Sequence, residues 1–263
     1  MSTNIEPARE GLLGIGVPTE MVEDAIALIP QSTEGLLVYG SRARGDHIPD
    51  SDLDLLALVS PARKGSTRGQ VSLSCYTRAQ LATAKGTLFG VHLRRDSKLL
   101  SDPHGYLESA LTGMGEVDTD RLFERIRRLS LVLDAGTLDR GRSLPGLVRQ
   151  AKYLLRSALY GLAITEGEPC FSVRELAKRY RDPKLSRLLA SRSRNTPTEE
   201  ELEDLTDRLA RVVGDHPKNH HGSLDALIVN EWGREADLVS VAVMARGHES
   251  SSDPYEEIDK VLL

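Results

Sequence analysis

The stretch Leu36–Val59, LLVYGSRARGDHIPDSDLDLLALV, constrains the fold more than any other part of the chain. Its two short apolar runs flank a polar turn, which predicts two strands of an α/β domain. The second run places two acids, Asp52 and Asp54, among leucines. Because residues i and i+2 of a strand share a face, these carboxylates project together, with Cα atoms about 7 Å apart. An exposed edge strand with solvated aspartates is the alternative, but it leaves the apolar residues on both sides unexplained.

Two carboxylates on one face repel each other and raise each other's pKa unless a cation lies between them. A divalent ion with hard oxygen ligands neutralises such a pair. Mg²⁺ typically binds through one or two carboxylates together with substrate phosphates. We therefore expect Mg²⁺ as the cofactor, with Asp52 and Asp54 as its ligands.

The turn YGSRARG, which ends the first apolar run, is a candidate phosphate site. Here Gly40 ends the expected strand, and Ser41 is expected to act as the N-cap of a short helix, SRARGD. Free N–H groups at a helix start attract anions, and a glycine lets a phosphate approach the backbone. The segment is no Walker loop, because the Gly-Lys-Ser/Thr ending is absent.

The combination GSRARGDHIPDSDLDLLALV resembles the signature of the DNA polymerase β-like nucleotidyltransferase superfamily, in which Gly-Ser precedes an Asp-hydrophobic-Asp-hydrophobic strand. The resemblance implies that Gly40 and Ser41 hold the β and γ phosphates of a nucleoside triphosphate. It also implies that Asp52 and Asp54 bind two Mg²⁺ ions at the α-phosphate. Arg44, together with Arg42, is a candidate phosphate contact, with a role on the helix surface as the alternative.

One departure from the family pattern concerns a third carboxylate, which relatives usually carry on the next strand. That strand is expected in QVSLSCYT, where Ser72 and Ser74 stand in place of an acid. Three explanations stay open. Asp96 enters from the following element, with His92 as a proton acceptor; the enzyme works with two acids; or the chain has lost catalysis and only binds nucleotide. For Asp96 the simpler interpretation is a salt bridge to Arg94, Arg95 or Lys98.

Beyond about residue 116 strand signals fade and amphipathic helical patterns follow. We expect an α/β (α+β) nucleotidyltransferase domain with a mixed sheet over residues 1–116 and an all-α bundle over 117–263. This arrangement resembles small bacterial and antibiotic nucleotidyltransferases, whose helical bundle receives the acceptor. The expected helices of the second part are Asp120–Ala135, Leu144–Glu166, Ser172–Tyr180, Thr198–Val213 and Ser223–Ala245.

Composition sets further bounds. The formal net charge of −5 gives no global basic footprint for nucleic acid, and the basic clusters at 121–128 and 174–181 are interpreted as solvated helix faces. Two cysteines without metal or redox spacing and a polar start without a long apolar run favour a cytoplasmic protein. The histidines of HPKNHHG lack supporting acids, which disfavours zinc. Trp232 is expected to anchor the last helix.

These features together predict a Mg²⁺-dependent enzyme that transfers NMP, most simply AMP from ATP, to a hydroxyl of an acceptor and releases pyrophosphate. Asp52, Asp54 and Asp96 are the candidate catalytic residues, and Gly40, Ser41 and Arg44 are the candidate nucleotide contacts. The acceptor can be a small molecule, a tRNA or a protein. The alternative is a catalytically weak binding module of a toxin–antitoxin pair, so a toxin–antitoxin partner or a homodimer is also an expectation.

Overall fold

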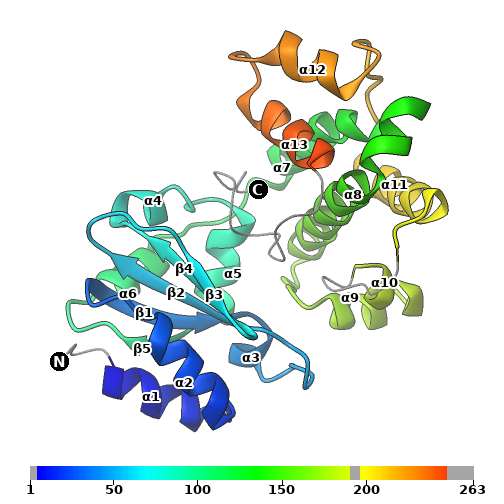
Figure 1. Cartoon of the computed structure of the whole chain (residues 1–263). Helices are drawn as coiled ribbons and strands as arrows, with labels where there is room; N and C mark the ends of the chain where they lie inside the picture. Colours follow the sequence, from blue (N-terminus) through cyan, green and yellow to red (C-terminus); the bar gives the residue numbers. More distant parts are fainter. Residues whose placement is uncertain (1–4, 190–195, 248–263) are drawn as a thin grey trace. The chain divides into compact units, whose positions relative to one another are not determined.

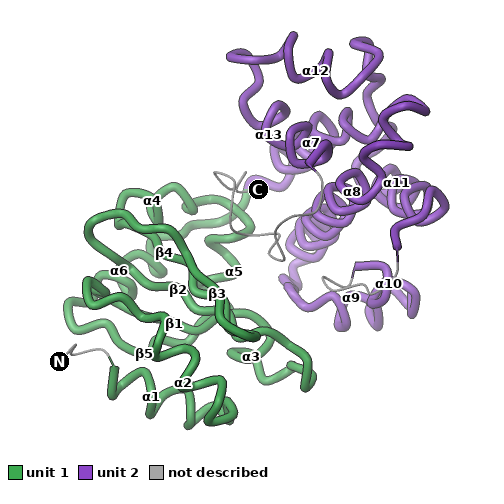
Figure 2. Tube along the Cα trace, in the orientation of Figure 1, with its two compact units in different colours: residues 1–117, 262 green, residues 118–261, 263 purple. Residues whose placement is uncertain are grey.

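The computed structural model describes residues 5–189 and 196–247. The chain divides into two compact units, which Figure 2 shows in green and purple. Unit 1 comprises Met1–Val117, and unit 2 begins at Asp118. Among the described residues, no helix has the length and apolar character needed to cross a membrane.

Unit 1 is built around a sheet of five strands flanked by short helices (Figure 1). Its elements in chain order are α1 (Ile5–Gly14), α2 (Thr19–Leu28), β1 (Thr33–Tyr39), α3 (Gly40–Arg44), β2 (Leu53–Val59), β3 (Ser66–Arg68), β4 (Val71–Tyr76), α4 (Arg78–Ala82), α5 (Leu88–Asp96), β5 (Lys98–Ser101) and α6 (Tyr106–Thr112).

The sheet has the strand order β3-β4-β2-β1-β5 and is mixed. Strand β2 runs antiparallel to β1 and parallel to β4, while β5 and β3 are antiparallel edge strands. The strand that carries the Asp-Leu-Asp-Leu pattern therefore lies at the centre of the sheet. Its central position explains why its apolar residues point to both faces, and it excludes the edge-strand alternative.

Alternation along the strands sends side chains to two separate cores. On one face Leu53 and Leu55 pack against α1 and α2, and on the other Leu37 and Leu56 pack against residues of α4, α5 and α6. Figure 1 shows these helix groups on opposite sides of the sheet. Since Asp54 alternates with Leu53 and Leu55, its side chain lies on the same face as Leu56, which is the face covered by α5.

Unit 2 is all-helical and centred on a helix of 29 residues. Helices α7, α11 and α13 pack against this central helix, and α12 packs against α13 (Figure 1). The elements are α7 (Thr119–Leu129), a 3₁₀ turn (Ser130–Leu133), α8 (Thr137–Thr165), α9 (Val173–Arg179), α10 (Pro183–Leu188), α11 (Glu199–Val213), α12 (Leu224–Glu231) and α13 (Ala236–Arg246).

Small residues bring α8 and α13 into close contact. A Cβ atom on Gly146 would lie 1.8 Å from the carbonyl oxygen of Ala245, so only glycine fits at this crossing. Pro145 directly precedes it inside the helix. The central helix begins at Thr137 rather than at the expected Leu144, and it continues through Pro145, a residue type that commonly kinks or ends a helix.

The expected fold class, a mixed-sheet α/β part followed by helices, is confirmed. Two details differ. The single helix expected over Ser223–Ala245 is interrupted after Glu231 and resumes at Ala236 as α13. Trp232 lies in this interruption with 71% of its surface exposed, so the prediction that it anchors a helix in the core is wrong.

Candidate active site

The turn between β1 and α3 brings Gly40 and Ser41 to the end of the central strands. The chain leaves β1 at Tyr39, which is extended, and Gly40 then adopts φ +77°, the left-handed region that favours glycine. Helix α3 spans Gly40–Arg44, with Tyr39 as the N-cap and Gly45 as the C-cap. Ser41 is therefore inside the first turn and is not the N-cap that the sequence suggested, because the strand ends one residue earlier than expected.

Gly40 lies directly against Asp54. In the antiparallel register Tyr39 pairs with Asp54, so the next residue of β1's continuation approaches the same side chain. A Cβ atom built on Gly40 would lie 2.8 Å from Oδ2 of Asp54. The glycine thus leaves space over the half-buried carboxylate that any other residue would fill.

Asp52 is half-buried and immediately precedes β2. The preceding residue, Ser51, is held by Arg42, whose Nε and Nη2 donate to the Ser51 carbonyl oxygen at 3.1 and 2.8 Å. Arg42 is only 4% exposed. Burial lowers the pKa of its guanidinium, while the negative charge of Asp52 opposes this shift. Arg42 therefore positions the loop that carries Asp52, which is a different role from the phosphate contact considered from the sequence.

Ser72 occupies the place beside Asp54 on the neighbouring strand. The parallel register of β2 and β4 pairs Asp54 with Ser72 and Leu56 with Ser74. Where the family resemblance calls for a third acid, the structure thus has a hydroxyl. Within residues 5–189 and 196–247, no three histidine, cysteine or acidic side chains gather in a way that could hold a metal ion.

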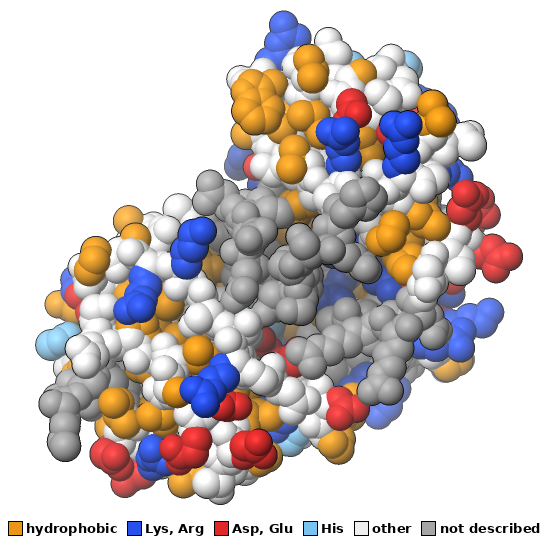
Figure 3. Space-filling model, viewed as in Figure 1, with side chains coloured by type: hydrophobic (Ala, Val, Ile, Leu, Met, Phe, Trp, Pro, Cys, Tyr) orange, Lys and Arg blue, Asp and Glu red, His pale blue; other side chains and the backbone are white. Residues whose placement is uncertain are grey.

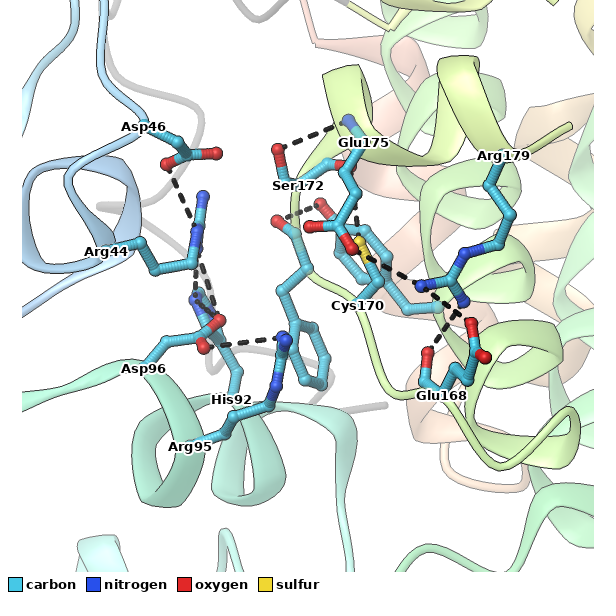
Figure 4. Close-up of polar contacts among 12 residues, drawn as sticks. Arg44, Asp46, His92, Arg95, Asp96, Glu168, Cys170, Ser172, Glu175 and Arg179 are labelled. Atoms are coloured by element: carbon cyan, nitrogen blue, oxygen red, sulfur yellow. Dashed lines mark hydrogen bonds and ion pairs between the residues drawn. The ribbon is translucent and has the colours of Figure 1, made fainter. Parts of the chain in front are cut away.

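Asp96 and Arg44 belong to a buried polar cluster at the end of α5 (Figure 4). Arg44 Nη1 contacts Asp96 Oδ2 at 3.3 Å, and its Nε contacts Asp46 at 3.2 Å. Arg95 contacts the other oxygen of Asp96 at 3.4 Å, and His92 Nε2 lies 3.6 Å from Oδ2. The Asp96 side chain is only 5% exposed. The salt bridge to Arg95 considered from the sequence is present, and Arg44 is a second partner that sequence spacing could not indicate.

Burial shifts the protonation equilibria in this cluster. Removal from water, reinforced by the positive charges of Arg44 and Arg95, lowers the pKa of His92 to about 3. Burial raises the pKa of Asp96, while Arg95 and Arg44 act to lower it. The His92 ring also meets Tyr39 edge-on, with centroids 5.9 Å apart. Through Tyr39, which pairs with Asp54, the cluster lies on the same face of the sheet as the carboxylate pair.

Comparison with known families agrees with this geometry. Residues 25–100 match the family model described as a nucleotidyltransferase domain. The chain carries a nucleotidyltransferase domain. This family belongs to the DNA polymerase β-like superfamily, so the domain is a transferase of the EC 2.7.7 type that uses a nucleoside triphosphate as substrate. Such nucleotidyltransferases generally use a divalent metal ion. No curated protein matches the chain.

Several polar side chains of unit 2 have hydrogen-bond or ion-pair partners within unit 2. Arg156 donates to the Leu189 carbonyl at 2.6 Å, and the Tyr160 hydroxyl donates to the Phe171 carbonyl at 3.2 Å. Both ring nitrogens of His216 are hydrogen-bonded, to Ser130 at 2.8 Å and to Thr206 at 2.9 Å. His221 contacts Glu231 at 3.1 Å. These contacts account for His216 and His221 as structural residues of unit 2.

Proposed function

We propose that the nucleotidyltransferase domain transfers a nucleoside monophosphate, AMP from ATP, to a hydroxyl group of an acceptor in a Mg²⁺-dependent reaction that releases pyrophosphate. The observation that carries this proposal is the position of Asp54, at the start of the central strand and directly against the Gly40 turn. Carboxylate oxygens and the first backbone N–H groups of α3 thereby meet at one place.

The residues present fit a divalent ion. Asp52 and Asp54 supply hard oxygen donors, and the absence of a side chain on Gly40 leaves the approach to Asp54 Oδ2 open. Two carboxylates with the remaining positions filled by water and phosphate oxygens are a common Mg²⁺ environment. When bound, Mg²⁺ supplies neutralisation of phosphate charge and alignment of the reacting oxygens.

The chain's own groups then orient the nucleotide. The first N–H groups of α3, at Gly40 and Ser41, have no acceptor within the helix and donate to the leaving phosphates. Arg44 is anchored by Asp96 and Asp46 on one side, and we place it as a cationic contact for the triphosphate. Asp52 is held in place by Arg42 through Ser51.

In the reaction the acceptor oxygen forms a bond to the α-phosphorus while the bond from that phosphorus to the bridging oxygen breaks. Pyrophosphate leaves with that bonding pair, and the hydroxyl proton passes to a base. Asp96 with His92 is the candidate base on this face, and a two-acid enzyme with water as the proton acceptor is the alternative. Because Asp96 is held between two arginines, we favour a positioning role toward Arg44.

Ser72 favours a second candidate function. A serine is a poor metal ligand and no base near neutral pH, so its place beside Asp54 is compatible with a catalytically weak nucleotide-binding module of a toxin–antitoxin pair. The two functions differ in one measurable property, because a module of that kind binds nucleotide without releasing pyrophosphate.

We assign the domains accordingly. Residues 1–116 form the nucleotidyltransferase domain, and 117–263 form a helical domain that receives the acceptor, which can be a small molecule, a tRNA or a protein. We also propose that the chain associates with a toxin–antitoxin partner or with a second copy of itself.

The decisive experiment incubates the purified full chain with MgCl₂, each labelled nucleoside triphosphate, and either small hydroxyl acceptors, tRNA or cell extract. Label transfer should be lost in Asp54→Ala and kept in Asp50→Ala, a matched control because Asp50 is an exposed acid in the turn directly before β2. Magnesium-dependent nucleotide binding without transfer to any acceptor would favour the binding module. Equal label transfer by the two variants, at a level above background, would contradict the proposed metal-binding role of Asp54, and the transfer itself would contradict the binding module.

A further inference from the structure

Helices α9 and α10 carry exposed basic side chains without compensating acids. Residues 173–188 include six Lys or Arg and two acids. Within the described parts of the chain both acids are engaged, Glu175 by Arg179 and Asp182 by Arg208. Five of the six cations are exposed and make no ion pair with any described residue. We call these five residues the α9–α10 basic surface: Arg174, Lys178, Arg181, Lys184 and Arg187.

The spacing of these cations concentrates their charge. Arg174 and Lys178 are four residues apart on α9, and Lys184 and Arg187 are three apart on α10, so each pair shares a helix face. The two helices pack against each other. Lys178 and Arg187 lie in the last turns of α9 and α10, where a cation stabilises the helix. Arg174 and Lys184 lie in the first turns, where a cation is unfavourable, so local helix stability does not account for these two. Lys and Arg side chains gather in the part of Figure 3 where Figure 1 labels α9 and α10.

Arg181 adds an independent observation from the backbone. Asp182 N–H donates to Ala177 and Arg181 N–H donates to Lys178, which is the Schellman ending of a helix. The residue in the left-handed position is Arg181, with φ +52°, and it is the only non-glycine residue with positive φ among those described. At the end of α8 the same pair of hydrogen bonds surrounds Gly167, with φ +78°. An arginine in a position where glycine is favoured carries a conformational cost, and such strained positions cluster at functional sites.

We propose that the α9–α10 basic surface binds the phosphate backbone of a double-helical nucleic acid. Protein interfaces have an apolar centre, and membrane-surface helices insert apolar side chains. None of the large exposed hydrophobic residues of the described chain lies on α9 or α10. Single-strand binders stack bases on aromatic rings, but Tyr180, the aromatic residue of this segment, is half-buried and donates to Glu166. Electrostatic attraction is then the remaining basis for binding at this surface. A nucleic-acid duplex suits it, because a duplex presents negatively charged phosphates at regular spacing.

This inference goes beyond the transfer reaction, because binding through these cations needs neither a nucleoside triphosphate nor a metal ion. It also revises the interpretation of the 174–181 cluster as a solvated helix face. The overall charge of −5 had argued against nucleic acid, but it averages over the chain and conceals a local concentration of cations.

The test measures binding of the full chain to labelled RNA and DNA duplexes, to the corresponding single strands and to anionic lipid vesicles, in EDTA and without nucleotide. Both duplexes should bind, with log affinity falling against log salt concentration at a slope of about −4.5 for five phosphate contacts. The triple variant Arg174→Gln, Lys178→Gln, Arg187→Gln should lose at least about tenfold in affinity and reduce the slope by about 3. Asp54→Ala should bind like the wild type, which separates this test from the test of transfer.

A matched control removes three exposed cations of unit 2 outside this surface, through Arg121→Gln, Arg142→Gln and Arg211→Gln. A second variant, Arg181→Gly, relaxes the backbone, so it should melt no lower than the wild type while its affinity for duplexes falls. Equal losses in the two triple variants, wild-type affinity in the first, or preference for single strands or vesicles would overturn the proposal.

Discussion

Gly40 and Asp54 are in contact across the β1–β2 pair, with no space for a side chain between them. The residue at position 40 must therefore adopt a left-handed backbone conformation and also allow the carboxylate of Asp54 to lie against its Cα atom. Glycine alone satisfies both, since it adopts φ +77° without strain and has no Cβ to meet Oδ2 of Asp54. The Gly-Ser turn and the acid pair consequently form one structural unit, although eleven residues lie between Gly40 and Asp52 in the chain.

Gly40→Ala should reduce kcat/KM by about 100-fold or more, because displacing a reacting group by about 1 Å has effects of that size. Gly45→Ala is the matched control: Gly45 has φ +80° at the other end of the same helix, with no atom within 4 Å of its Cβ position. Both variants should lose about 1 kcal/mol of unfolding free energy to the left-handed conformation. Urea unfolding and steady-state kinetics check this, and equal kinetic losses would contradict the contact as the cause.

Ser72→Asp should restore a third carboxylate beside Asp54. In EDTA the added charge should lower the unfolding free energy by about 0.5–1 kcal/mol, because like charges directly across a strand pair repel. With MgCl₂ the same variant should be stabilised more than the wild type, since a further ligand strengthens metal binding. Ser74→Asp, which pairs with Leu56 instead, should be destabilised in both conditions. If the melting temperature of Ser72→Asp were the same in EDTA and in MgCl₂, a metal ion at this position would be contradicted.

The strand that contains the acids could be predicted from the sequence, because local residue patterns determine it. Alternating apolar residues beside Asp52 and Asp54 required a strand, and its central place follows from burial of Leu53 and Leu55 on one face and Leu56 on the other. Strand periodicity also predicted a strand in QVSLSCYT, and the family resemblance implied that it lies beside the acid pair. Its parallel direction and the register that pairs Ser72 with Asp54 are known only from the structure.

Other features depend on contacts between distant parts of the chain, which periodicity cannot reveal. The partnership of Arg44 with Asp96 joins residues 52 positions apart, and the buried role of Arg42 depends on the course of the loop before β2. Trp232 is apolar and large, so burial was the natural expectation, but the break between α12 and α13 leaves it in solvent. The roles of Gly40, Ser41, Arg44, Asp52, Asp54 and Asp96 stay predictions.

Arg42→Lys should destabilise the protein by about 1–3 kcal/mol. A lysine supplies one compact ammonium in place of two aligned donors, so the Ser51 carbonyl would lose a charge-assisted hydrogen bond in a buried place. Arg63→Lys, at an exposed position of the same unit, should change stability by less than about 0.5 kcal/mol. Denaturant titration distinguishes them, and equal stability of both variants would show that the two bonds to Ser51 matter little.

Asp96→Asn should separate a positioning role from that of a general base. If Asp96 acts by holding Arg44, the KM for the nucleoside triphosphate should rise about tenfold while kcat changes little. Removal of a general base instead lowers kcat by about 100-fold or more. We expect the first pattern, because two arginines contact the carboxylate and its side chain is 5% exposed. A large loss in kcat at unchanged KM would assign Asp96 as the base.

His92→Gln should remove an acid sensitivity of the folded state. The pKa of His92 is lowered from its ordinary 6.5 to about 3, chiefly by burial. As pH falls below 6.5 the unfolded chain takes up a proton at this residue that the folded chain does not, so the unfolding free energy decreases by about 1.4 kcal/mol per pH unit. Between pH 6.5 and 5 the wild type should lose about 2 kcal/mol more than His92→Gln. The raised pKa of Asp96 acts in the opposite sense but is shared by both proteins, so parallel stability curves in urea would refute the buried neutral imidazole.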